Sequence, residues 1–115
     1  MDVVNRLATD ELMRRVKDGE PLLSRLFSIY QEETPRLLAD IEKGIISREE
    51  ELVYDSIHQM KGSSAAMGAT RVFALTEAAL DLCKGGAVFE LDRLAEALRV
   101  EVDLYMRELS IVLGA

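Results

Sequence analysis

The chain has 115 residues, of which 49% are hydrophobic, yet it contains no Trp and only three Tyr and three Phe. This length favours one domain over residues 1–115, and an aliphatic core of this kind is typical of a helical bundle. The 14 basic and 21 acidic residues give a net charge of −7, which would repel a nucleic-acid backbone. The sequence shows neither a signal-peptide pattern nor an apolar run long enough to span a membrane, so a cytoplasmic location is expected. Cys83, the only cysteine, cannot form an internal disulfide, and its apolar flank "ALDLC" indicates an inert core thiol.

Helical periodicity covers the chain between its few prolines and glycines. A short first helix is expected over about residues 7–17, with Gly19 placed to end it. A second helix should begin at Pro21, which suits a first helical position, and end at Gly44. Pro35 falls inside this second helix and should kink or divide it, because proline lacks the backbone N–H that a helix interior uses.

Three more helices are expected after Gly44. The segment "SREE" has the form of a capping box, with Ser47 as the N-cap and Glu50 at the third helical position, and it should start a helix that ends near Ala66. The next helix should cover about residues 70–84, where two glycines stop it. The last helix carries an apolar stripe with steps of three and four residues: Leu91, Leu94, Leu98, Val102, Tyr105, Leu109 and Val112.

Short loops between long amphipathic helices indicate that neighbouring helices are antiparallel. The expected fold is therefore all-α. It is an antiparallel up-down-up-down four-helix bundle with a short additional N-terminal helix that covers one end.

The third helix contains the only histidine of the chain, within the segment "SIHQMKGSSAAMGA". Its core-facing side follows helical spacing and consists of Val53, Ile57, Met60, Ser64 and Met67. His58 lies about 100° from Ile57 and about 160° from Met60 around the helix, so it should point to solvent. The residues that share its side are Tyr54, Asp55, Lys61, Gly62 and Ala65.

This outward row combines a nucleophile with a group that could hold an anion. An exposed neutral imidazole is a nucleophile near physiological pH, and Lys61 can place an ammonium group beside any anion attached to the ring. Gly62 costs about 1 kcal/mol relative to alanine inside a helix, yet its outward position offers no packing reason for it. A local rule that is broken without structural gain indicates function.

The segment "HQMKGSSAAMGA" resembles the signature of histidine-containing phosphotransfer (HPt) domains. That signature has His, any residue, a hydrophobic residue, Lys, Gly, two small residues, and a Gly-Ala pair several residues later. The segment "LFSIYQEETPRLLADIEKGI" is similar to the family's helix before the histidine, including a proline at that place. The order of the helices fits the family over about residues 7–112.

The resemblance implies a role for four residues. His58 would accept the phosphoryl group through Nε2, and Lys61 would offset the charge of that group. Gly62 would give the active site of a partner room to close over the ring, and Ser63 would assist by hydrogen bonding.

The resemblance also implies the partners. Family members do not make phosphohistidine from ATP, and the chain has no Gly-rich nucleotide loop. They accept the group from an aspartyl phosphate of one response-regulator receiver domain, which can belong to a hybrid histidine kinase, and pass it to another. The receiver would supply Mg²⁺, so no cofactor of its own is expected for this chain, and it is expected to be a monomer and not an enzyme.

Counting along the expected helices gives a docking rim for the partner. The third helix should run antiparallel to the second across a turn near residues 44–47, which places His58 level with Thr34 and Pro35. The candidate rim residues are Gln31, Thr34, Pro35, Leu38, Gln59, Ala65 and Ala66.

Two other functions were weighed from the same residues. A metal-binding bundle would use Asp55 and His58, but it needs this motif twice, and the single histidine points outward, so no metal site is expected. A bundle that binds receivers without transferring phosphate, as an adaptor or inhibitor, stays open as the alternative. The initiating Met and the clean ends favour a free-standing protein over a piece of a hybrid kinase.

Overall fold

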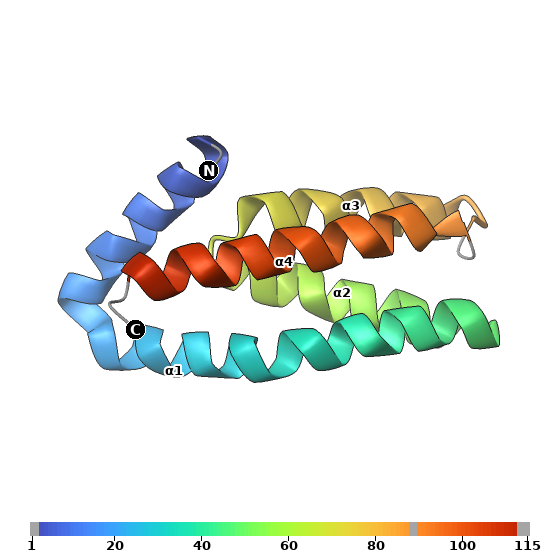
Figure 1. Cartoon of the computed structure of the whole chain (residues 1–115), viewed down its shortest axis with the longest axis horizontal. Coiled ribbons are helices and arrows are strands. Elements are labelled where there is room, and N and C mark those ends of the chain that lie inside the picture. Colours follow the sequence, from blue (N-terminus) through green and yellow to red (C-terminus); the bar gives the residue numbers. More distant parts are fainter. Residues whose placement is uncertain (1–2, 88–89, 113–115) are drawn as a thin grey trace.

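In this computed structural model the backbone is described for residues 3–87 and 90–112, and the side chains for residues 24–87 and 90–111. Within these ranges the chain forms four helices, α1 (Val3–Ser47), α2 (Glu50–Ala66), α3 (Thr70–Lys84) and α4 (Asp92–Val112). Each helix packs against the next, and α4 packs back against α1, so the helices form an antiparallel bundle (Figure 1). The all-α four-helix bundle expected from the sequence is therefore confirmed. None of the helices in the described ranges combines the length and the apolar character needed to cross a bilayer.

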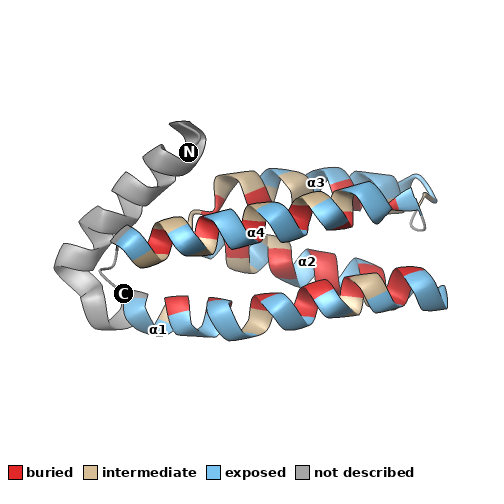
Figure 2. Ribbon diagram, viewed as in Figure 1, coloured by how far each residue is buried: buried red, intermediate tan, exposed pale blue. Residues whose placement is uncertain are grey.

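The core is built from one face of each helix, and the buried residues lie mainly on the sides that face neighbouring helices (Figure 2). On α4 and at Leu91 just before it, the buried positions follow the predicted stripe, with Leu94 partly buried against the core: Leu91, Leu98, Val102, Tyr105 and Leu109. The side chain of Val112 lies outside the described residues. Because burying one such aliphatic side chain contributes about 1.5–3 kcal/mol, these faces fix how each helix is turned.

The connections after α2 and α3 are short because each of these helices ends at a glycine in the left-handed conformation. Gly68 has φ 67° and Gly86 has φ 82°. At the end of α2 the N–H of Ala69 donates to the carbonyl oxygen of Ser64 over 2.9 Å, which is the hydrogen bond of a Schellman motif. The chain therefore reverses tightly after the helix that carries His58.

The predicted division of the first half of the chain is wrong. A helix over residues 7–17 and a second over residues 21–44 were expected, but α1 is one helix that continues through Gly19, Pro21 and Pro35. Pro35 does not divide it, because this residue lies on the exposed side while buried residues before and after it hold α1 against the bundle. The prediction that residues 7–17 cover one end of the bundle concerns side chains that lie outside the described residues.

The predicted capping box is also wrong. α2 begins at Glu50 without a side-chain cap, and Ser47 is the last residue of α1. Arg48 takes a left-handed φ of 61°, and the N–H of Glu49 donates to the carbonyl oxygen of Gly44 over 2.9 Å. This hydrogen bond ends α1 in a Schellman motif, as at the end of α2, with Arg48 in the left-handed position that Gly68 takes there. Ser47 therefore belongs to the end of α1 and does not cap α2.

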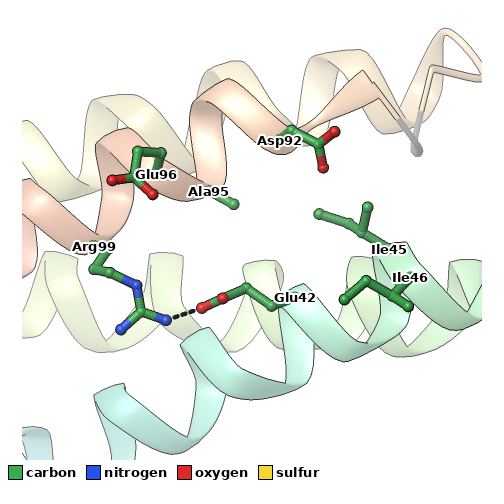
Figure 3. A pocket seen from close by; sticks show the side chains of 7 residues that line it. All are labelled: Glu42, Ile45, Ile46, Asp92, Ala95, Glu96 and Arg99. Carbon is green, nitrogen blue, oxygen red and sulfur yellow. Dashed lines mark hydrogen bonds and ion pairs between the residues drawn. The ribbon is translucent and has the colours of Figure 1, made fainter.

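An ion pair joins α1 to α4 on the side of the bundle away from α2. Figure 3 shows the guanidinium of Arg99 on α4 directed at the carboxylate of Glu42 on α1. The hollow beside this pair is lined by residues of these two helices alone: Glu42, Ile45, Ile46, Asp92, Ala95, Glu96 and Arg99. Because both partners of the pair are about half exposed, it contributes at most about 1 kcal/mol, and apolar burial holds α1 and α4 together.

Candidate functional site

The rotation of α2 is set by its buried face. All five residues predicted to face the core are buried: Val53, Ile57, Met60, Ser64 and Met67. The hydroxyl groups of Tyr30 on α1 and Ser64 on α2 form a buried hydrogen bond of 2.9 Å. The Tyr105 hydroxyl of α4 donates to the carbonyl oxygen of Met67 at the end of α2. Burial raises the pKa of both tyrosines, so both hydroxyls are protonated at neutral pH. Their hydrogen bonds therefore join α2 to α1 and α4.

His58 lies on the exposed side of α2, as the sequence predicted. The ring of Tyr54, one turn earlier, is stacked on the imidazole with the ring centroids 6.1 Å apart and the planes 18° from parallel. A stacked neighbour covers a face of the imidazole, whereas the two nitrogen atoms lie at the edge of the ring. Tyr54 therefore restrains the orientation of the imidazole without covering the ring edge that carries the nitrogen atoms.

Lys61 lies one turn after His58 and is held by α3. Its Nζ is 5.5 Å from the centroid of the Phe73 ring and 3.9 Å from Oε2 of Glu77. The long aliphatic stem of lysine lets the ammonium group reach either these partners or an anion on the imidazole. Neither Phe73 nor Glu77 was a candidate from the sequence, because helical spacing within α2 does not show which residues of α3 lie beside it.

Gly62 is exposed, and a Cβ atom at this position would meet no heavy atom within 4 Å. The glycine therefore leaves open space on the same side of α2 as His58. Gly44 is the contrasting case, because a Cβ there would lie 2.5 Å from Cγ2 of the buried Val53. Gly44 is explained by close packing of α1 on α2, and Gly62 is not explained by packing.

Ser63 faces α1. It lies about 140° around α2 from His58, since each residue turns a helix by about 100°. Its Oγ donates to Oε1 of Glu33 on α1 over 3.0 Å, and the carbonyl oxygen of Gln59 lies within 3.1 Å as a second acceptor. The hydroxyl proton is thus directed to the contact between α1 and α2 and away from the face that carries His58.

Three of the predicted rim residues, Gln59, Ala65 and Ala66, are exposed on α2. The other four line a groove between α1 and α4 together with residues such as Val102 and Met106: Gln31, Thr34, Pro35 and Leu38. Thr34 and Leu38 are moreover buried, with 1% and 4% of their surface exposed.

The expectation that these four residues border the face of His58 is therefore wrong, for two geometric reasons. Glu33 marks the side of α1 that meets α2, and Pro35 lies about 160° around the helix from it at about 100° per residue. The contacts of Tyr30 with Ser64 and of Glu33 with Ser63 also place His58 level with Leu37 rather than with Thr34. Counting residues predicted approximately which residues of α1 lie at the height of His58. It could not predict which of those residues lie on the side of α1 that faces α2.

A shallow apolar hollow lies where α1 meets α2 beyond the histidine. It is lined by residues of these two helices and of the turn after α2: Leu26, Ile29, Tyr30, Ser63, Ala66 and Met67. Ile29 is 48% exposed, so part of its apolar side chain can be contacted from outside. Because the hollow includes Ala66, it continues the exposed surface of α2 onto α1.

The remaining candidate groups do not form a second site. In the ranges that the structure describes, no three side chains of His, Cys, Asp or Glu come together in a way that could hold a metal ion. Cys83 is half-buried, and burial raises the pKa of its thiol, which keeps it protonated at neutral pH. The chemistry that the described residues offer is therefore that of the exposed imidazole of His58 with Lys61 one turn later on the same helix.

A family model described as the Hpt domain matches residues 25–109. Because this match covers most of the chain, the protein belongs to the Hpt domain family, and the resemblance seen in the sequence is confirmed. Comparison with curated proteins and with solved structures gave no match. Hpt domains are phosphotransfer carriers rather than kinases, and they interact with receiver domains and histidine kinases. The protein therefore functions in histidine phosphotransfer within two-component signalling.

Substitutions of Gly62 distinguish a role of this glycine in packing from a role in phosphotransfer. Gly62→Ala should keep or raise the free energy of unfolding, by up to about 1 kcal/mol, because alanine favours helix and its Cβ meets nothing. Gly62→Gln should leave the bundle folded but slow phosphorylation of His58, because the longer side chain would stand where a partner approaches. Urea unfolding and the rate of phosphoryl uptake from a phosphorylated receiver measure the two effects.

Gly44→Ala is the matched control for these variants. Its Cβ would collide with Val53, so this substitution should lower the free energy of unfolding by about 1–3 kcal/mol despite the better helix propensity of alanine. If Gly62→Gln lowered the free energy of unfolding by a similar amount or unfolded the protein, Gly62 would be a packing residue like Gly44.

Proposed function

We propose that His58 accepts a phosphoryl group from the aspartyl phosphate of one receiver domain and passes it to the aspartate of another. One observation supports this proposal above all. The only histidine of the chain is exposed on α2, and Lys61 and the open space at Gly62 follow it within about one turn of the same helix. A partner can thus reach the imidazole without displacing any side chain at position 62.

The transfer step is an in-line displacement at phosphorus. The lone pair of Nε2 forms the new P–N bond while the bond from phosphorus to the receiver's aspartate breaks, and its electron pair stays on the carboxylate. The proton on Nδ1 is retained or released to solvent, which balances the charge on the ring. Transfer onward is the reverse reaction with a second receiver, so the imidazole is regenerated.

This chain would contribute few groups to that reaction. The Tyr54 ring restrains the imidazole, and Lys61 offsets part of the negative charge of the bound phosphoryl group. The receiver would supply Mg²⁺, which neutralises charge on the transferring group. A positioned nucleophile and one cation on a rigid helix are then sufficient, because phosphoryl transfer depends mainly on alignment and on charge stabilisation.

We infer that the receiver docks along the exposed side of α2. Gln59, Ala65 and Ala66 would lie in this contact, and the apolar hollow at Ile29 would extend it onto α1. Small residues on α2 allow a close approach to the helix, and an apolar side chain of the partner can fill the hollow. The groove between α1 and α4 lies on another side of the bundle and takes no part in this contact.

Phosphoryl transfer to His58 can be tested with one variant. Incubation with a phosphorylated receiver should transfer a label to the wild-type protein, and that label should be acid-labile and base-stable, as expected for a phosphorus–nitrogen bond. His58→Gln removes the only imidazole and should take up no label while staying folded, because the side chain is exposed. Label that persisted in His58→Gln would contradict the assignment. No label with several receivers would favour an adaptor that binds without transfer.

The docking surface can be tested with two exposed positions of α1. Ile29→Asp should slow transfer by about tenfold, because it places a charge in the apolar hollow beside α2. Gln31→Asp introduces the same side chain on the side of α1 that faces α4, and it should change the rate by less than about twofold. The rates of phosphoryl transfer to the two variants are compared at a subsaturating concentration of the receiver, after both variants have been shown to be folded. Equal effects of the two substitutions would contradict docking along α2.

A further inference from the structure

Glu77 is an acidic residue of α3 that lies beside Lys61. Its Oε2 is 3.9 Å from Nζ of Lys61, and the same ammonium group lies over the ring of Phe73 at 5.5 Å from the centroid. The side chains of Lys61 and Glu77 are 34% and 52% exposed, so both can move into solvent. The structure thus places the ammonium group of Lys61 against α3.

We propose that Glu77 sets how tightly His58 holds its phosphoryl group, by competing with that group for the ammonium of Lys61. The inference rests on the proposed function and concerns a residue outside the "HQMKGSSAAMGA" motif. Glu77 forms no covalent bond and takes no proton in the transfer. It acts through Lys61 and is therefore a positioning residue.

The competition follows from where the charges lie before and after transfer. Before transfer, the ammonium of Lys61 is partly neutralised by Glu77 and rests against Phe73. After transfer, the phosphoryl group adds close to two negative charges on His58, one helical turn from Lys61. Because lysine is a flexible point cation with three donors, it can turn toward this group, but it must then leave Glu77. The loss of that contact weakens the hold on the phosphoryl group.

The carboxylate also acts directly. Once Lys61 has turned away, Glu77 is an uncompensated negative charge on the helix next to the phosphorylated one. Repulsion between like charges in partly exposed positions is modest and falls as salt is added. Both effects have the same sign, since each disfavours the phosphorylated state of this protein relative to the phosphorylated receiver.

This arrangement suits a carrier that must release what it accepts. A phosphoryl group held too firmly by Lys61 would remain on His58, and onward transfer would stall. Exposed ion pairs change equilibria only modestly, so Glu77 should shift the transfer equilibrium by about two- to fivefold. A shift of this size keeps the reaction reversible without preventing phosphorylation.

The test is the equilibrium constant of transfer between the protein and a phosphorylated receiver, approached from both directions. Glu77→Gln should shift it about two- to fivefold toward the phosphorylated carrier, and the shift should shrink in high salt. In a Lys61→Ala background the same substitution should have a smaller effect, because the competition for the ammonium group is gone and only the direct repulsion by the carboxylate remains. Thermal unfolding of each variant confirms that the fold is unchanged, as expected for an exposed side chain.

Glu96→Gln is the matched control, since it removes the same charge from an exposed position on α4, which neighbours α3 and α1 in the bundle. It should leave the equilibrium constant unchanged. An unchanged constant in Glu77→Gln, or an equal shift with and without Lys61, would overturn the inference while the proposed function stands. Absence of label in the wild-type protein would overturn both.

Discussion

The buried hydrogen bond between Tyr30 and Ser64 acts together with the apolar face of α2 to fix the rotation of this helix, and the site depends on that rotation. Ser64 is fully buried and small, so α1 comes close to α2 at this point, and the two hydroxyls are each other's partners inside the core. An unsatisfied hydroxyl there would cost about 1–3 kcal/mol, which opposes any other register. Turning α2 by one residue, about 100°, would move His58 toward the core and expose apolar residues. The outward direction of the imidazole is therefore a consequence of packing two turns away.

The two helices beside α2 each hold one residue of the motif with an acidic side chain. Glu33 of α1 accepts the hydroxyl proton of Ser63, and Glu77 of α3 lies beside Lys61. The exposed side of α2 is consequently bordered by negative charge on both sides, within a chain whose net charge is −7. A phosphoryl group on His58 would therefore have Glu33 and Glu77 on the two helices that flank α2. These acidic neighbours leave part of the charge of that group to be offset by a partner, which agrees with the role of Hpt domains as phosphotransfer carriers.

Helical period was sufficient to predict α2, α3 and α4 and the inward face of α2. These helices are amphipathic, and glycine ends both α2 and α3, so sequence and packing agree. The prediction failed where local and tertiary preferences compete. α1 continues through Pro35 because burial on both sides of it outweighs a missing hydrogen bond, and Ser47 does not cap α2 because α1 extends to include it.

The surroundings of His58 were harder to predict than its direction. Spacing within one helix gives the residues that share a face, which placed Lys61 and Gly62 correctly on the side of the imidazole. It does not give the rotation of the neighbouring helices. For that reason Gln31 and Leu38 were expected beside the histidine but line the groove with α4, whereas Phe73 and Glu77 were not expected and lie beside Lys61.

The central claim is that Nε2 of His58 carries the phosphoryl group. Because His58 is the only histidine, protein labelled with ¹⁵N-histidine has a single labelled imidazole, and nuclear magnetic resonance can follow its two nitrogens separately. After transfer from a phosphorylated receiver and removal of that receiver, ³¹P should show coupling to ¹⁵Nε2 and none to ¹⁵Nδ1. A phosphorus signal without nitrogen coupling, or coupling to Nδ1 alone, would contradict the claim.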